Sequence, residues 1–258
     1  MKINFSKYQG AGNDFIIIDN RNDQLKPTMN TLFKELCHRK KGIGADGLIL
    51  INSAKYHHFE MCYFNSDGQL GSMCGNGGRC SVDFAHHLRL FEESCTFLTC
   101  DGTHHAIWHE KEVQISMNDV YQIELQNDFL FLNTGSPHYV SFVKNCNTID
   151  VYKLGRNIRF NDRFSKDGTN VNFAHIEGQT IVLRTYERGV EEETLACGTG
   201  AVATAISAYE KGFILSNSIA VKVKGGLLKV TFQKDGQSYT DVQLIGPADF
   251  VFKGEYIC

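Results

Sequence analysis

The chain has few prolines, a single tryptophan and no long apolar run. Of its 258 residues, 3 are proline, 1 is tryptophan and 24 are glycine, so its loops depend on backbone freedom and close approach. The longest apolar runs, residues 48–51 and 129–132, are far shorter than the roughly 18 residues that cross a bilayer. Hydrophobic residues make up 42% and charged residues 21%, which excludes wholesale disorder and indicates a folded globular protein.

An excess of basic charge is also missing. Lys and Arg together number 26 and Asp and Glu number 29, so the chain lacks the electrostatic footprint of a nucleic-acid-binding protein. The one basic run, residues 38–41, lies where a helix is expected to end, and we interpret it as compensation of the helix dipole. The first seven residues are too polar for a secretory signal, which predicts a cytoplasmic protein that does not act on membranes.

The nine cysteines form no framework of disulfides or metal ligands. Their number is odd, and no two of them have the Cys-x2-Cys spacing that is typical of zinc sites. We therefore expect reduced thiols and no bound metal, with most of the cysteines acting as small buried side chains.

Hydrophobic periodicity predicts mixed α and β structure in both halves of the chain. A helix is expected after a Thr28 cap, with its end at Gly42, and a second one runs from Cys74 to about Leu88. Two more helices are predicted at 149–158 and 201–211, the latter stopped by Gly212. Strands are predicted at residues 16–18, 48–51, 59–64, 106–109, 113–117, 129–133, 138–143, 181–187, 219–223, 228–232 and 239–245. The strands at 106–109 and 113–117 are expected to form a hairpin across a charged turn, and a second hairpin around residues 177–179 leads into 181–187.

A short pattern occurs once in each half. Cys74-Gly75-Asn76-Gly77 opens one predicted helix, and 123 residues later Cys197-Gly198-Thr199-Gly200 opens another. Chance placement of both copies at helix N-termini is improbable, so the repeat predicts two similar domains that face each other. Their boundary is expected at residues 117–120, which gives domains of residues 1–117 and 118–248.

A thiol at a helix N-terminus meets unpaired backbone N–H groups and the positive end of the helix dipole. Both lower its pKa from about 8.5 towards neutrality, so Cys74 and Cys197 are candidate acid–base groups. The uncovered amides of Gly75, Asn76, Gly198 and Thr199 could hold a carboxylate. One cysteine as thiolate could then remove a proton from one face of a carbon acid, while the other as thiol returns a proton to the opposite face.

Two other readings compete with this one. Either cysteine alone could be a buried structural thiol. The alternative from another class is a dinucleotide-binding protein. Residues 198–203 match the dinucleotide fingerprint G-x-G-x-x-A. However, polar residues precede it where a strand should end, and Ala220 stands where an acidic residue is expected.

The chain resembles the diaminopimelate epimerase family almost from end to end. The matching motifs are residues 5–15 (FSKYQGAGNDF), 42–47 (GIGADG), 73–80 (MCGNGGRC), 187–189 (ERG), 194–201 (TLACGTGA), 246–248 (GPA) and 251–255 (VFKGE). The resemblance implies an α+β fold of two similar domains, each a curved sheet around a central helix, facing across a cleft. It also implies that the last strand, residues 249–258, returns to the N-terminal domain.

The family's activity is a cofactor-independent isomerisation of LL- and meso-diaminopimelate in lysine and cell-wall precursor synthesis. By resemblance, Cys74 and Cys197 are the paired acid and base, and His138 and Glu187 adjust their pKa values. The resemblance further implies a homodimer. It places substrate contacts on Asn13, Gly47, Asn65, Gly75, Asn76, Ser136, Asn170, Glu187, Arg188, Gly198 and Thr199.

Two positions depart from the family pattern. Ser136 stands where the family usually has Asn, and Gly47 where some members have Gln. Both lose an amide, which bears on recognition of the distal end of the substrate and not on the two thiols. Proline racemase is the related alternative, although it typically carries His at the position of Asn76 and has no use for a distal clamp such as Glu187 and Arg188.

Overall fold

The computed structural model describes residues 1–110 and 112–258, and the chain divides into two compact units. The first comprises Met1–Ile115 together with Gly246–Cys258, and the second comprises Ser116–Ile245. Within the described residues, no helix is long and apolar enough to cross a membrane.

The described residues of the first unit form two helices and eight strands. The helices are α1 (Asn30–Cys37) and α2 (Gly75–His87). In order across the sheet, the strands are β17 (Asp249–Ile257), β1 (Lys2–Gly10), β2 (Asn13–Asp19), β3 (Gly47–Asn52), β4 (Phe59–Asn65), β5 (Ser94–Thr99), β6 (Gly102–His109) and β7 (Glu112–Ser116). Lys111, in the predicted charged turn between β6 and β7, lies outside the described residues.

The second unit repeats this inventory. Its helices are α3 (Val151–Arg159) and α4 (Gly198–Glu210), with a short 3₁₀ turn, η1, at Cys146–Thr148. Across the sheet, the strands are β8 (Ile123–Leu125), β9 (Leu130–Asn133), β10 (Pro137–Phe142), β11 (Asn170–Glu177), β12 (Thr180–Glu187), β14 (Ser218–Val223), β15 (Gly226–Asp235) and β16 (Ser238–Gly246). A three-residue strand, β13 (Glu192–Thr194), pairs with the end of β12.

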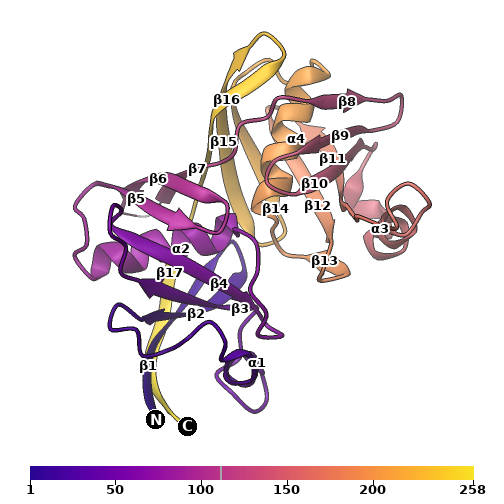
Figure 1. Ribbon diagram of the computed structural model, residues 1–258. Coiled ribbons are helices and arrows are strands. Elements are labelled where there is room, and N and C mark those ends of the chain that lie inside the picture. The colour runs from indigo at the N-terminus through magenta and orange to yellow at the C-terminus, as the bar shows by residue number, and fades with distance from the viewer. Residues whose placement is uncertain (111) are drawn as a thin grey trace. The chain divides into compact units, whose positions relative to one another are not determined.

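The two sheets share one order of strand directions. In each, seven successive pairings run antiparallel, antiparallel, parallel, antiparallel, parallel, antiparallel and antiparallel. The position that β8 fills in the second sheet is filled in the first by β17, from the end of the chain, which runs beside β1 in Figure 1. The repeat seen as two short sequence motifs therefore extends over two similar mixed α/β domains.

One helix in each unit is buried by the strands around it. Helix α2 packs against β1, β2, β3, β4, β6 and β17, and α4 packs against β9, β10, β11, β12, β14 and β15. Each helix has 13 residues, and nearly all of them are buried because glycine, alanine and serine let the strands approach closely on every side. Each sheet thus surrounds one helix, whose N-terminus is held in place from several directions.

Helices α1 and α3 cover the other side of their sheets. Phe33 and Leu36 of α1 pack on Ile16, Leu48 and neighbouring apolar side chains. Helix α3 contributes Val151 to a cluster with Val171 and Phe173 of β11. The smaller helices therefore close a second apolar layer outside the strands.

The predicted limits of α1 are wrong at both ends. Its N-cap is Met29 and makes no side-chain cap hydrogen bond, so Thr28 does not cap it. The helix ends at Cys37 and not at Gly42, because the backbone N–H groups of Gly44 and Ala45 turn back to the carbonyls of Leu36 and Cys37. Gly42 is required for a different reason: a Cβ there would lie 2.0 Å from the Glu35 carbonyl oxygen.

Candidate functional site

In the first unit, three of the predicted binding residues lie at the same end of neighbouring strands. Asn13 begins β2, Gly47 begins β3, and Asn65 ends β4. Gly47 pairs with Phe15 on one side and with Asn65 on the other. The alternation of parallel and antiparallel pairing brings these positions together although they are far apart in the sequence.

Cys74 is the N-cap of α2 and lies beside this group of strand ends. Its Sγ accepts a 3.5 Å hydrogen bond from the Gly77 backbone N–H, as expected for a capping side chain. On its other side, Sγ lies 3.8 Å from Oδ1 of Asn13, which is placed to accept the thiol proton. The Asn76 side chain also donates to Oδ1 of Asn13, at 3.5 Å. The thiol therefore faces both the helix N-terminus and a fixed amide oxygen.

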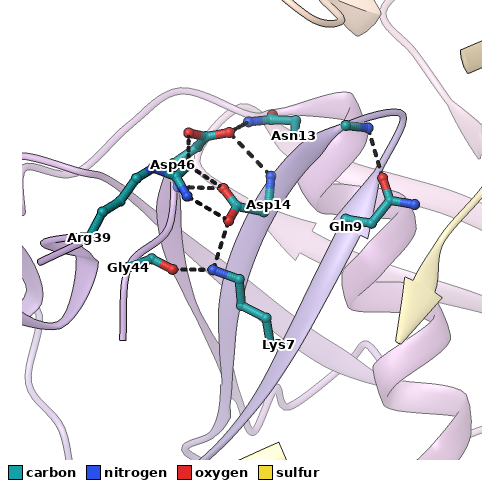
Figure 2. A network of polar contacts seen from close by, with 8 residues as sticks. Lys7, Gln9, Asn13, Asp14, Arg39, Gly44 and Asp46 are labelled. Atoms are coloured by element: carbon teal, nitrogen blue, oxygen red, sulfur yellow. Dashed lines mark hydrogen bonds and ion pairs between the residues drawn. The ribbon is translucent and has the colours of Figure 1, made fainter. Parts of the chain in front are cut away.

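A network of charged residues holds the Asn13 amide in this orientation (Figure 2). Asn13 Nδ2 donates to Asp46 Oδ2 at 2.7 Å, and Asp46 pairs with Arg39 at 2.6 Å. Arg39 also forks onto both oxygens of Asp14, at 2.7 and 3.0 Å. Buried Lys7 completes the network, with an ion pair to Asp14 at 2.8 Å and a hydrogen bond to the Gly44 carbonyl.

The network lowers the pKa of Asp14 and changes the interpretation of the basic run at residues 38–41. Burial raises the pKa of Asp14, but hydrogen bonds from Arg39 and Lys7 outweigh it and hold the pKa at about 2. The sequence alone predicts that residues 38–41 compensate the helix dipole. That interpretation is wrong for Arg39, whose guanidinium is committed to the two carboxylates.

At Gly47 the departure from the family pattern has a steric cause in this chain. A Cβ at position 47 would lie 2.4 Å from Cε2 of Tyr63, and one at Gly71 would lie 2.6 Å from Cδ1 of the same ring. The Tyr63 ring thus fills the space between two glycines and stacks edge-on against Phe15. A side chain larger than hydrogen has no room at position 47.

In the second unit, Cys197 is the N-cap of α4 and is buried. Its Sγ lies 3.5 Å from the Thr199 hydroxyl. The Thr199 carbonyl accepts a 2.9 Å hydrogen bond from the Thr134 hydroxyl, which fixes the first turn of the helix against the loop before β10. Ser136 belongs to that loop, and its carbonyl accepts from the Thr134 backbone N–H at 3.1 Å.

His138 lies fully buried between two asparagines. Asn172 Nδ2 donates to the Tyr139 carbonyl and lies 3.0 Å from His138 Nδ1, while its Oδ1 accepts from the Thr185 hydroxyl at 3.0 Å. This fixes the amide of Asn172. Both ring nitrogens of His138 face an amide Nδ2, at 3.0 Å from Asn172 to Nδ1 and at 3.5 Å from Asn170 to Nε2, so we assign the acceptor to Nδ1, which has the shorter contact, and the ring proton to Nε2. Burial, aided by the charge of Arg188, lowers the pKa of His138 to about 3.

Asn170 joins His138 to the predicted distal residues. It pairs with His138 across the parallel strands β10 and β11, and its Oδ1 accepts a 2.9 Å hydrogen bond from the backbone N–H of Arg188. Arg188 Nη1 donates to the Asp167 carbonyl at 2.8 Å. Glu187, at the end of β12, accepts from the Thr194 hydroxyl at 2.9 Å. These residues occupy the same ends of β10, β11 and β12 as Asn13, Gly47 and Asn65 occupy in the first unit.

Other chemistries find less support in the described residues. No group of three or more His, Cys, Asp or Glu among them could hold a metal ion. The stretch that matches the dinucleotide fingerprint is the first turn of α4, where Gly200 approaches Asn172 so closely that a Cβ would lie 2.6 Å from its Oδ1. The glycine there serves packing against a buried asparagine.

Several residues around the two cysteines were not singled out from the sequence. They are Asp46, Tyr63, Arg79, Thr134 and Asn172. Asp46 lies in a glycine-rich motif that could have drawn attention to it, and Arg79 lies within the first cysteine motif. The others carry no sequence signal, because their roles depend on which strands become neighbours.

The chain is similar to known proteins over nearly its whole length. The family model for diaminopimelate epimerase matches residues 5–123 and 130–251. A diaminopimelate epimerase from Flavobacterium psychrophilum is 48% identical over 250 residues, covering 96% of this chain and 97% of its own length. One from Chlorobaculum tepidum is 43% identical over 95% of this chain and 98% of its own.

Solved structures share the fold at low sequence identity. A phenazine biosynthesis protein of the PhzF family from Bacillus anthracis superimposes with a TM-score of 0.77 at 15% identity, over all of both chains. A probable proline racemase from Agrobacterium radiobacter gives a TM-score of 0.75 at 13% identity, over 99% of this chain and 93% of its own. The family match over nearly the whole sequence is the decisive finding: the chain belongs to the diaminopimelate epimerase family.

Proposed function

We propose that the chain is a cofactor-independent epimerase that interconverts LL- and meso-2,6-diaminopimelate. The observation that carries the proposal is the repetition of one device: each of two similar domains has a cysteine as the N-cap of its buried helix, followed by glycines. Family membership supports the substrate, since the relatives that match over almost their full length are diaminopimelate epimerases.

Inversion at one α-carbon follows from two thiols of opposite protonation. The thiolate of one cysteine takes the α-proton, so the C–H bond breaks, an S–H bond forms and the electron pair stays on carbon. The thiol of the other cysteine then gives its proton to the opposite face of that carbon. Backbone N–H groups at Gly75–Asn76 and Gly198–Thr199 hold the adjacent carboxylate and stabilise the charge that develops.

The distal amino-acid end of the substrate is assigned to the polar residues at the strand ends. Arg188 can fork onto the distal carboxylate, whereas Glu187 can accept from the distal ammonium. The amides of Asn13, Asn65 and Asn170 add donors and acceptors. Gly47 and Ser136 complete this group through backbone groups and one hydroxyl.

His138, as a neutral neighbour, and Glu187, as an acidic one, adjust the pKa values of the two thiols. A neutral His138 can exchange a hydrogen bond without adding positive charge. An imidazolium at this position would instead stabilise a thiolate strongly through its positive charge.

The reaction belongs to lysine and cell-wall precursor synthesis, which we assign to the cytoplasm. A homodimer is also part of the proposal. Phe250, Val251 and Phe252 on β17 are each 45–53% exposed, and neighbouring apolar side chains on one strand are typical of a covered surface. Light scattering over a range of protein concentrations tests this assignment, and a monomer throughout would remove it.

The activity is tested by α-proton exchange in D2O. The protein is incubated with LL-diaminopimelate without added cofactor, and deuterium incorporation is followed by NMR together with the appearance of the meso isomer. We expect both. Exchange on proline in the absence of exchange on diaminopimelate would instead place the chain with proline racemases.

A further inference from the structure

A fully buried arginine lies directly beneath the first cysteine. Arg79, one turn into α2, donates from Nη1 to the Gly75 carbonyl at 3.2 Å and from Nη2 to Asn76 Oδ1 at 3.0 Å. Its Nε donates to the Pro247 carbonyl at 3.2 Å, in the segment that leads into β17. The guanidinium therefore donates hydrogen bonds to the two residues that follow Cys74.

The positive charge of Arg79 has neutral partners in these contacts. Two are backbone carbonyls and one is an amide oxygen, and within residues 1–110 and 112–258 no carboxylate forms an ion pair with it. Removing a cation from water is costly unless a negative group compensates for it. Burial lowers the pKa of Arg79, whereas the negative charges of ionised Cys80 and Cys74 oppose that effect.

Of these two thiols, Cys74 is the one that can carry the compensating charge. Cys80 is completely buried, and burial raises the pKa of its thiol in spite of Arg79. Cys74 is partly exposed and accepts the Gly77 N–H at the N-terminus of α2, where an anion is favoured.

Other charged groups around the helix are held by partners of their own. Asp83 accepts from the Trp108 indole at 2.8 Å, and Asp249 of β17 accepts from Gln9. Burial and Asp83 raise the pKa of the Tyr8 hydroxyl, which stays neutral. On the side of β2, Asn13 Oδ1 favours the protonated form of Cys74, so it opposes the arginine.

The second helix has no counterpart of this cation. Five residues after Cys74 comes Arg79, and five residues after Cys197 comes Val202, which is also fully buried. Both cysteines cap helices of equal length in similar domains, so the arginine is a difference between two otherwise repeated half-sites.

We propose that Arg79 is a positioning residue that selectively stabilises the thiolate form of Cys74 and orients the side chain of Asn76, making the two thiols inequivalent. The inference rests on the proposed use of Cys74 as a proton carrier. The test measures the reactivity of the thiols directly, so failure of this inference and failure of the epimerase assignment are distinguishable.

The test is the pH dependence of iodoacetamide alkylation, with the modified peptides of Cys74 and Cys197 quantified by mass spectrometry. Arg79→Gln keeps a hydrogen-bond donor and removes the charge, and we expect it to raise the alkylation midpoint of Cys74 by about one pH unit or more. Cys197 in the same sample is the internal control, and its midpoint should not move. Arg79→Lys restores a cation and should return the Cys74 midpoint towards the wild-type value.

A second readout is the pH profile of α-proton exchange on LL-diaminopimelate, whose acidic limb should move to higher pH in Arg79→Gln. Equal shifts at Cys74 and Cys197, or no shift at Cys74, would overturn the proposal. If Arg79→Gln does not fold, as judged by circular dichroism, the wild-type protein still decides. A Cys74 midpoint at or above the ordinary thiol value of about 8.5 contradicts the proposal.

Discussion

The side-chain amide of Asn13 donates a 2.7 Å hydrogen bond to the carboxylate of Asp46. Because an amide has donors on one arm and an acceptor on the other, this bond decides what Asn13 presents to Cys74: its oxygen, at 3.8 Å from Sγ. Asp46 is in turn fixed by Arg39, which pairs with Asp14, and Asp14 is itself paired with Lys7. The orientation of one side chain at the thiol is thus set by a charged network behind it (Figure 2).

Loss of the Asp46 carboxylate is expected to weaken catalysis by freeing the Asn13 amide to rotate. We expect Asp46→Ala to lower kcat/KM by about tenfold or more, the scale of one hydrogen bond to a charged group. Asp46→Asn keeps an acceptor for Asn13 but loses the Arg39 ion pair, so its effect should be smaller. Steady-state kinetics on LL-diaminopimelate measure both.

Asp19→Asn is the matched control for this comparison. Asp19 also lies in the first unit and pairs with an arginine, Arg21, at 2.7 Å, with a similar exposure to water. Its kinetics should remain those of the wild type. An effect of Asp19→Asn as large as that of Asp46→Ala would mean that general surface charge, and not the orientation of Asn13, is responsible.

Replacing either proposed proton carrier should stop inversion. Cys74→Ala and Cys197→Ala each remove the group that serves one face of the α-carbon, and a loss of about 10²–10⁴-fold or more is expected for a general acid or base. Circular dichroism should show a retained fold. Cys258→Ala, at an exposed cysteine, should keep full activity. Turnover near the wild-type rate in either single alanine variant would reject the two-thiol mechanism.

His138 should remain neutral over the working pH range. Its pKa is about 3 because burial disfavours the charged ring, so the folded protein holds fewer protons than the unfolded chain between about pH 6.5 and 3. This contribution to stability is complete above pH 6.5 and is lost as the pH falls through that window. Ring ¹⁵N NMR should report the Nε2–H tautomer from pH 5 to 8, and a titration midpoint near 6.5 would contradict the assignment.

Much of the fold could be predicted from the sequence, although its details could not. The internal repeat at Cys74 and Cys197 indicated two similar domains, and the helices at both cysteines were expected. Strands β1 and β5 and the three-residue strands β8 and β13 are not among the strands predicted from the sequence. In β1 the alternation of Ile3 and Phe5 is interrupted by the buried cation of Lys7, so its periodicity is poor. The domain boundaries given from the sequence remain predictions.

The site residues divide according to how local their signals are. Cys74 and Cys197 were found because glycines and a helix start adjoin them in the sequence. Asp46 and Asn172 act through partners more than 30 positions away, on strands whose pairing no local pattern specifies. Gly47 departs from the family pattern because the ring of Tyr63, 16 positions further on, leaves no room for a side chain there. Such relations depend on tertiary packing.

Substrate choice should depend on Arg188, whose backbone is tied to Asn170 and whose Nη1 contacts the Asp167 carbonyl. If Arg188 forks onto the distal carboxylate, Arg188→Leu should cost several kcal/mol in kcat/KM for LL-diaminopimelate, because a charge-assisted bidentate contact is lost.

Lysine should be a poor substrate for the wild type for the same reason. It lacks the distal carboxylate, and a site built around a polar group rejects an analogue without that group by about 10⁴–10⁵ in favourable cases.

The measurement is kcat/KM for LL-diaminopimelate, lysine and proline on the wild type, on Arg188→Leu and on Arg163→Leu. Arg163 is an exposed arginine of the same unit that pairs with Glu124, so its variant should keep the preference for diaminopimelate. Arg188→Leu should lower the ratio of kcat/KM for diaminopimelate to kcat/KM for lysine, because only diaminopimelate loses a contact. Comparable rates on lysine and diaminopimelate in the wild type, or a preference for proline, would remove the distal clamp while leaving the two-cysteine chemistry in place.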